Sequence, residues 1–280
     1  MQLSHAKVNL YLKVGKKLES SYHNIQSLMM PIQLHDNISF EKLTEDEIIV
    51  DSNNPDLEGG ENLAHKAAFL LKQKFKVKEG IRIFIEKNIP MSAGLGGGSS
   101  NAAHALVTLN SIWNIKIPEK KLITLGAEIG ADVPFFIVGK TAVVEGIGEK
   151  IKPIKKSMSI NLVLVNPGIK VATSWAYRQF DKAKPVKNEK KIAEILKAIS
   201  KKDIKKISQN LHNDFEKIIE KKYPIIAEIK TNLKKFGSLS NVMSGSGPTI
   251  AGVFESIYPA REAYFKLKDL YPFVYLTKTF

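Results

Sequence analysis

The chain has 280 residues, of which 44% are hydrophobic and 25% are charged, as in an ordinary globular protein of one large or two smaller domains. No apolar run approaches the roughly 18 residues that cross a bilayer, and the opening MQLSHAKVNLYLKVG lacks a signal-peptide core, so we expect a cytoplasmic protein. The absence of cysteine excludes a disulfide framework, a thiolate zinc site and a cysteine nucleophile.

The formal net charge of +14 is compatible with a nucleic-acid partner, because basic surfaces attract phosphate groups. However, only Arg82, Arg178 and Arg261 are arginines, and lysine lacks the planar fork that recognises bases and phosphates. Many lysines lie in residues 181–210, mixed with acidic residues at amphipathic helical spacing. We therefore expect a solvated lysine-rich face, a small-molecule substrate, and neither a nucleic acid nor a membrane as partner.

The first predicted element is a strand, because apolar and polar residues alternate through AKVNLYLK, residues 6–13. This alternation places Lys7 and Asn9 together on the polar face of the strand. We expect that face to be exposed.

A helix is predicted over residues 62–75, and a strand over residues 81–85, where isoleucines alternate. The glycine-rich loop GLGGGSS, residues 94–100, follows that strand and precedes a helix predicted over residues 99–110. Free backbone N–H groups and the helix dipole favour an anion at such a helix N-terminus.

The second half predicts helices over an antiparallel sheet, so the fold class is α+β with two domains, residues 1–155 and 156–280. Before the boundary we expect a helix ending within residues 128–139 and strand structure over 141–154. Beyond it we expect a strand at 160–166, helices at about 188–200, 203–218 and 222–236, a strand at 249–254, a helix at 258–270 and a strand at 273–279.

The spacing of the glycine-rich loop excludes two common phosphate-binding patterns. The Walker pattern needs a lysine after its last glycine, and the third glycine of G-x-G-x-x-G falls at Ser99. A cradle for nucleotide phosphates remains. The alternative is a tight turn with Ser99 or Ser100 as N-cap, although four glycines within residues 94–98 exceed what a cap requires.

Three motifs resemble those of the GHMP kinase family and lie in the family's order along the whole chain. PMSAGLGGGSSNAAHAL resembles the second motif, MSGSGPTIAGVF the third, and SHAKVNLYLKV the first. The resemblance implies an N-terminal domain similar to domain 2 of ribosomal protein S5, a ferredoxin-like C-terminal domain, and an active site between them. Within the family, AKVNLYL, SYHNIQSLM and GADVPFF resemble kinases that act on a cytidine diphosphate ester.

The resemblance implies transfer of the ATP γ-phosphoryl group to a hydroxyl of that ester. Asp132 matches the family's catalytic aspartate and would be the general base, with Lys7 as its paired cation and Asn9 bonding substrate. The alternatives are a turn cap for Asp132 and a solvated surface lysine for Lys7.

The same resemblance assigns the binding residues. Tyr22 and His23 would recognise cytosine, Tyr177 would stack on its ring, and Gly245, Ser246 and Gly247 would close over the substrate phosphates. Gly94, Gly96, Gly97, Gly98, Ser99 and Ser100 would hold the ATP phosphates, with Asn62 and Lys87 near adenine.

Mg²⁺ is expected with ATP, although the sequence names no protein ligand for it. Ser21, Ser92 and Ala93 stand where the family has glycine.

We expect a monomer or a weak dimer. Two alternatives remain, namely a GHMP kinase of the homoserine or mevalonate type, and a nucleic-acid-binding protein with an S5-like fold.

Overall fold

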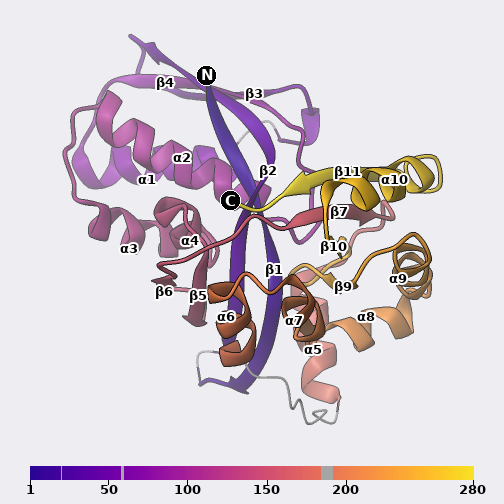
Figure 1. The fold of residues 1–280 in the computed structure, drawn as a ribbon. Coiled ribbons are helices and arrows are strands. Elements are labelled where there is room, and N and C mark those ends of the chain that lie inside the picture. The colour runs from indigo at the N-terminus through magenta and orange to yellow at the C-terminus, as the bar shows by residue number, and fades with distance from the viewer. Residues whose placement is uncertain (20, 58–59, 184–191) are drawn as a thin grey trace.

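The computed structural model describes residues 1–19, 21–57, 60–183 and 192–280, which form two β-sheets with helices packed on them (Figure 1). This arrangement confirms the predicted α+β class. Among the described residues the first sheet has seven strands in the order β3-β4-β2-β1-β8, with β5 paired to β2 and β6 to β5. Their bounds are Gln2–Lys17 for β1, His23–Leu43 for β2, Ile48–Ser52 for β3, Gly80–Glu86 for β4, Ala142–Gly146 for β5, Lys150–Pro153 for β6 and His212–Asn213 for β8.

The β1–β2 hairpin is the longest feature of the fold, and its first strand carries predicted site residues. The expectation of an exposed polar face on β1 is wrong, because Lys7 is 3% exposed and Asn9 is 1% exposed. Segments distant in sequence cover this face. The backbone N–H of Lys7 donates to the carbonyl of Leu95 at 3.0 Å, and that of Asn9 donates to Oγ of Ser244 at 3.2 Å.

Four helices and the first sheet enclose a hydrophobic core. Helix α1 spans Leu63–Phe75, α2 spans Gly97–Ile112, α3 spans Glu119–Ile129 and α4 spans Val133–Val138, and a 3₁₀ turn spans Pro55–Leu57. In α1, residues Ala64, Ala67, Ala68 and Leu71 supply the buried stripe at helical spacing. The predictions of this helix and of the helix after the glycine loop are confirmed.

The second sheet has, among the described residues, four antiparallel strands in the order β11-β7-β10-β9. They span Asn161–Asn166 for β7, Ser240–Met243 for β9, Ile250–Phe254 for β10 and Phe273–Lys278 for β11. Alternate residues of β7 enter two different cores. Leu162 and Leu164 pack with residues of β1 and β2, whereas Val163 and Val165 pack with the helices on the other side.

The described helices of the second half span Thr173–Lys182 for α5, Ile192–Ser200 for α6, Ile204–Gln209 for α7, Glu216–Lys222 for α8, Ile225–Lys235 for α9 and Ile257–Leu267 for α10. The sequence did not predict α5, and α9 and α10 are shorter than predicted. The continuous helix predicted over 203–218 is wrong. Strand β8 interrupts it by pairing with β1, and the side chain of Asn213 accepts from the N–H of Phe215 at 2.9 Å. Residues 188–191 of the helix predicted over 188–200 lie outside the described residues.

The proposed boundary between residues 155 and 156 falls in the connection from β6 to β7. Strand β8 nevertheless belongs to the first sheet, so the second half of the chain contributes to both sheets. No helix in the described ranges is long and apolar enough to cross a membrane.

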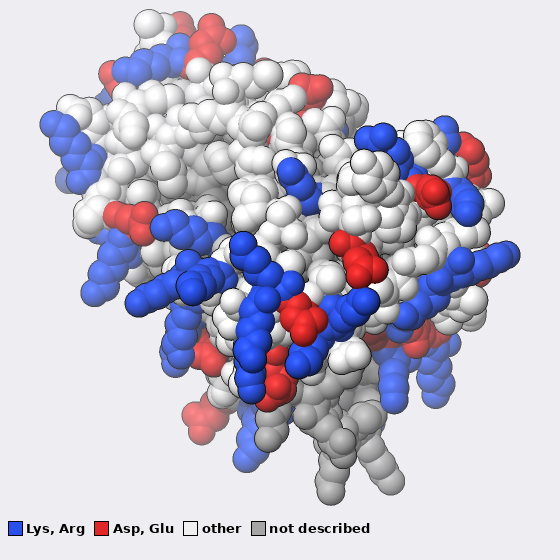
Figure 2. Space-filling view, in the orientation of Figure 1, with Lys and Arg blue, Asp and Glu red and all other residues white. Residues whose placement is uncertain are grey.

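Basic and acidic side chains alternate over the face that carries α6 and α7 (Figure 2). Lys205 lies 3.4 Å from a carboxylate oxygen of Glu255, and Lys206 lies 4.0 Å from one of Asp203. This mixture is typical of a solvated face, as the sequence predicts.

Candidate active site

A lysine and an aspartate from distant segments meet at the centre of the molecule. Nζ of Lys7 in β1 lies 3.4 Å from Oδ2 of Asp132, which directly precedes α4. Asp132 makes no side-chain cap bond to α4, and its side chain is 30% exposed, whereas that of Lys7 is 4% exposed. Asp132 therefore occupies the N-cap position of α4 without capping the helix through its side chain, and the alternative of a solvated surface lysine at Lys7 is wrong.

Neighbouring polar groups hold the lysine in place. Nζ of Lys7 donates to Oδ1 of Asn9, and Nδ2 of Asn9 donates to Oγ of Ser27 at 2.8 Å. Because its carbonyl oxygen faces Lys7, the Asn9 amide orients the ammonium group. The predicted pairing of Lys7 and Asn9 on one face is confirmed, although that face is buried.

The glycine-rich loop begins α2 without a side-chain cap. Gly96 is the N-cap with φ 72°, and the helix begins at Gly97, so the alternative of Ser99 or Ser100 as N-cap is wrong. A Cβ on Gly96 would lie 2.7 Å from the ring of Phe136, so both conformation and space require glycine here. The first N–H groups of a helix have no partner within it, which leaves those of α2 available to an anion.

The glycine-rich third motif packs against this loop. Oγ of Ser244, a fully buried side chain, donates to the carbonyl of Gly94 at 2.9 Å and accepts from the N–H of Asn9. Ser246 contacts Thr173 through their hydroxyls at 2.8 Å. Ser244 thus joins the three motifs, and the sequence analysis missed it although it lies within the third motif.

A cavity of 330 Å³ lies where these segments meet. Its walls include eight of the predicted site residues, namely Lys7, Asn9, Gly94, Gly96, Asp132, Tyr177, Gly245 and Ser246. Among the described residues that line it, Lys7 is the only basic one and Asp132 the only acidic one. The cavity therefore combines one cation, one carboxylate and two glycine-rich segments.

An aromatic group borders the same cavity. Burial and the nearby Asp132 carboxylate raise the pKa of the Tyr177 phenol in α5 to about 12. The His23 ring stacks on Tyr177 with a centroid distance of 5.0 Å and an interplanar angle of 25°. His23 is buried, whereas Tyr22 is 60% exposed, and neither residue lines the cavity. Their predicted contact with cytosine remains a prediction.

Two residues predicted near adenine flank the glycine loop rather than the cavity. Asn62 is the N-cap of α1, accepting from the N–H of Ala64 at 2.8 Å and donating to the carbonyl of Leu57 at 2.7 Å. Nζ of Lys87 lies so close to the loop that a Cβ on Gly97 would be 2.6 Å from it. Their assignment to ATP remains a prediction, as do those of Gly98, Ser99, Ser100 and Gly247.

Asp36 in β2 is a buried carboxylate that the sequence analysis missed. It forms an ion pair with Lys87, and Oδ1 accepts from the N–H groups of Asn88 and Ile89 at 2.8 Å each. Oδ2 accepts from Nδ2 of Asn101 at 3.0 Å. Burial lowers the pKa of Lys87 and the Asp36 charge opposes that shift. Asp36 thereby ties β2 to the segment before the loop and to α2.

The described residues contain no group of three or more metal-ligating side chains that could hold an ion. Asp132 is the one carboxylate that the described part of the chain places on the cavity wall. A Mg²⁺ ion that enters with ATP would suit this site, because magnesium keeps mainly phosphate oxygens and water as ligands.

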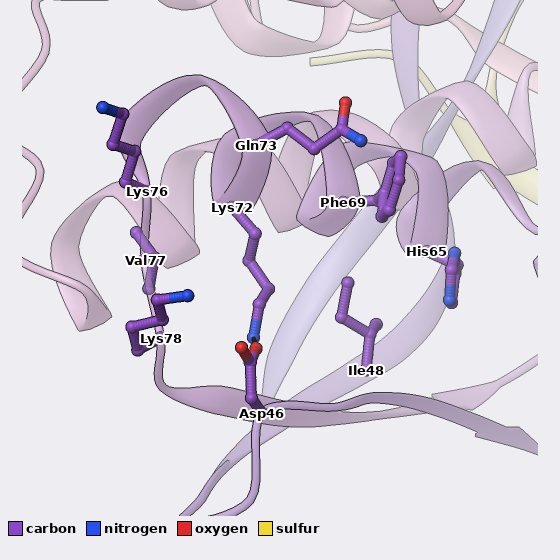
Figure 3. Close-up of a pocket in the computed structure, with 9 residues that line it drawn as sticks. All are labelled: Asp46, Ile48, His65, Phe69, Lys72, Gln73, Lys76, Val77 and Lys78. Carbon is purple, nitrogen blue, oxygen red and sulfur yellow. Dashed lines mark ion pairs between the residues drawn. The ribbon is translucent and has the colours of Figure 1, made fainter.

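A second cavity, of 540 Å³, lies beside α1 and β3 (Figure 3). Figure 3 shows Lys72 pointing from α1 to Asp46, with which it forms an ion pair, while Phe69 and Ile48 form an apolar end. This cavity contains none of the predicted site residues. The smaller cavity is therefore the candidate active site.

Comparison with known proteins identifies the class. The profile of the GHMP kinases N terminal domain matches residues 62–140, and that of the GHMP kinases C terminal domain matches residues 195–272. The chain belongs to the GHMP kinase family, and the predicted two-domain GHMP kinase fold is confirmed.

Two of its relatives and one solved structure carry the name of one particular kinase. The 4-diphosphocytidyl-2-C-methyl-D-erythritol kinase of Caldicellulosiruptor bescii is 41% identical over 99% of this chain and 96% of its own length. The kinase of the same name from Alkaliphilus oremlandii is 42% identical over 99% and 95%. A crystal structure of 4-(cytidine 5'-diphospho)-2C-methyl-D-erythritol kinase superposes with a TM-score of 0.85 and 31% identity, covering 99% of this chain and 98% of that one.

A mevalonate kinase of L. major shares the fold alone, with a TM-score of 0.78 and 15% identity over 99% of this chain and 94% of that one. The identity of about two fifths to the two kinases above favours their type over the mevalonate type, one of the alternatives considered within the family.

Proposed function

We propose that this protein transfers the γ-phosphoryl group of ATP to the 2-hydroxyl of 4-diphosphocytidyl-2-C-methyl-D-erythritol, a step of the non-mevalonate route to isoprenoid precursors. The single observation that carries the proposal is the cavity in which Lys7 and Asp132 meet two glycine-rich segments and Tyr177. The sequence identity of about two fifths to kinases of that name supports the substrate.

The acceptor hydroxyl would lie against Asp132, which takes its proton as the oxygen attacks phosphorus. Asp132 suits this role because its carboxylate is partly exposed toward the cavity and is not used as a cap. Lys7, fixed by Asn9, would neutralise charge on the transferred phosphoryl group.

The N-terminus of α2 would hold the ATP phosphates, and Gly245 and Ser246, in the third motif that packs against the loop, would contact the substrate phosphates. Mg²⁺ would supply counter-charge to the ATP phosphates, with Asp132 as the carboxylate nearest to the transferred group. Tyr177 would pack against the cytosine ring. We further propose residues 1–155 as the ATP-binding domain and residues 156–280 as the substrate domain.

The test is an ADP-release assay with Mg-ATP and 4-diphosphocytidyl-2-C-methyl-D-erythritol, run beside homoserine and mevalonate. The proposal predicts turnover with the cytidine compound alone. Turnover with homoserine or mevalonate alone would keep the kinase and overturn the substrate. No turnover with any of them, with salt-sensitive binding of nucleic acid instead, would overturn the proposed reaction.

A further inference from the structure

The buried ring of His23 is held by a carboxylate from another element. Nε2 of His23 in β2 lies 2.6 Å from Oδ1 of Asp181, at the end of α5. The other oxygen, Oδ2, accepts from Nζ of Lys17 in β1 at 2.8 Å. The His23 side chain is 4% exposed, whereas that of Asp181 is 30% exposed. The Asp181 carboxylate therefore connects α5 to both β1 and β2.

The donor and acceptor rules fix where the ring carries its proton. An aspartate is already ionised at neutral pH, and the hydrogen bond from Lys17 lowers the pKa of Asp181 further, so this carboxyl group only accepts. Nε2 must then be the donor in the contact with Asp181. The neutral ring consequently has its lone pair at Nδ1, for which the described residues provide no hydrogen-bond partner.

This ring adjoins the candidate active site. His23 stacks on Tyr177, and Tyr177 lines the cavity with Asp132. His23 itself does not line the cavity, but a base packed beside Tyr177 would come close to the His23 ring. Cytosine presents an amino group at its position 4, which donates, whereas uracil presents a carbonyl oxygen there, which accepts.

We propose that Asp181 is a positioning residue that fixes the Nε2–H form of His23, so that Nδ1 accepts from the amino group of cytosine and rejects uracil. This inference rests on the proposed function and adds to it the origin of base selectivity. Histidine tautomers are commonly set in this way by a carboxylate on the second nitrogen.

The test compares kcat/KM for the cytidine diphosphate ester and its uridine counterpart in wild type and in variants. Asp181→Asn keeps the shape but can donate to Nε2, which moves the ring proton to Nδ1. We expect it to lower the cytidine-to-uridine ratio by about tenfold, the value of one hydrogen bond. The loss should lie in KM for the ester, with KM for ATP unchanged.

Two controls separate positioning from structure. Asp181→Glu retains a carboxylate and should restore most of the ratio. Lys17→Met removes the exposed cation but leaves the Asp181–His23 contact, so it should keep the ratio. An unchanged ratio in Asp181→Asn, or a wild type that accepts both esters equally, would overturn the inference while leaving the proposed kinase intact. Absence of turnover by the wild type with the cytidine ester would instead refute the proposed function.

A second measurement needs no variant at Asp181 and no activity. Long-range ¹⁵N–¹H spectra of histidine-labelled protein report the tautomer of each ring, and His23→Asn assigns the signal. The inference predicts the Nε2–H form for His23. The Nδ1–H form would contradict it.

Discussion

The ammonium nitrogen of Lys7 and the Oδ2 atom of Asp132 lie 3.4 Å apart on the wall of a cavity that both glycine-rich motifs border. Lys7 belongs to the first strand and Asp132 to the turn before α4, so only the folded chain brings them together. The cation is buried and fixed by Asn9, whereas the carboxylate keeps access to the cavity. This asymmetry suits a fixed counter-charge beside a group that exchanges a proton.

Replacing Asp132 with Asn removes the proposed base and leaves the loop intact. We expect kcat to fall by about 10²–10⁴, the usual contribution of a general base, with ATP affinity nearly unchanged. ADP release and calorimetric titration with ATP measure the two quantities. Asp46→Asn, in the cavity of Figure 3, is the matched control and should retain full activity. Substantial turnover by Asp132→Asn would remove Asp132 from the role of base.

Gly97→Val tests whether the loop holds ATP. Its Cβ would lie 2.6 Å from Nζ of Lys87 and 3.1 Å from a methyl carbon of Ile89, so the first turn of α2 must shift. We expect KM for ATP to rise roughly tenfold or more, because small displacements of a binding group cost much affinity. Gly60→Ala, outside the loop, is the control, since among the described residues its Cβ would meet His65 alone, at 3.9 Å. An unchanged KM in Gly97→Val would favour a purely structural turn.

Ser92 adopts a backbone conformation that favours glycine, with φ 51°, and Ser21 does so with φ 66°. Both replace glycines of the family motifs. A left-handed non-glycine residue costs about 1–2 kcal/mol, of which glycine's greater freedom in the unfolded chain offsets about 0.5–1 kcal/mol. Ser92→Gly should therefore raise the free energy of unfolding by roughly 0.5–1 kcal/mol in urea denaturation.

Ala93→Gly should have the opposite effect, although it restores another family glycine. Ala93 is 2% exposed, and its φ is not positive. Glycine at this position only removes a buried methyl group and adds freedom to the unfolded chain, so it should lower the free energy of unfolding. Equal stability changes of the same sign at both positions would show that backbone strain does not govern them.

The proximity of Tyr177 to Asp132 has a spectroscopic consequence. The phenol pKa of about 12, above the ordinary 10.0, arises from burial and secondly from the Asp132 charge. In ultraviolet titration, the difference between wild type and Tyr177→Phe should show one phenol ionising near pH 12. Asp132→Asn removes the repelling charge and should lower this pKa while leaving it above 10.0. An unchanged phenol pKa in Asp132→Asn would show that the Asp132 charge does not act on Tyr177.

Sequence motifs predicted most of the catalytic centre. Lys7, Asn9, Asp132 and the loop glycines lie in the motifs that resemble the GHMP kinase family, and that family places an aromatic residue at the position of Tyr177, after the strand β7. One cavity is lined by Lys7, Asn9, Asp132 and Tyr177, together with the loop glycines Gly94 and Gly96. The burial of Lys7 could not be predicted from alternation, because the covering groups come from the loop and from the third motif.

The sequence gives weaker indications, or none, of helix α5, strand β8 and the buried Asp36. Helix α5 buries Ala176 alone, and β8 has two residues, so neither displays a usable period. Asp36 did offer a signal, since it occupies a buried position of β2 in alternation with Leu34 and Ile38. A carboxylate in that position indicates buried partners, but only the tertiary contacts identify them.

The most direct test of the account is a crystal structure of the protein with 4-diphosphocytidyl-2-C-methyl-D-erythritol and a non-hydrolysable ATP analogue. We expect the acceptor hydroxyl to lie within hydrogen-bond distance of Asp132 and the γ-phosphate to lie between Lys7 and the N-terminus of α2. The cytosine ring should pack against Tyr177. A cytidine ester bound elsewhere, for example in the cavity beside α1 and β3, with no hydroxyl near Asp132, would contradict it.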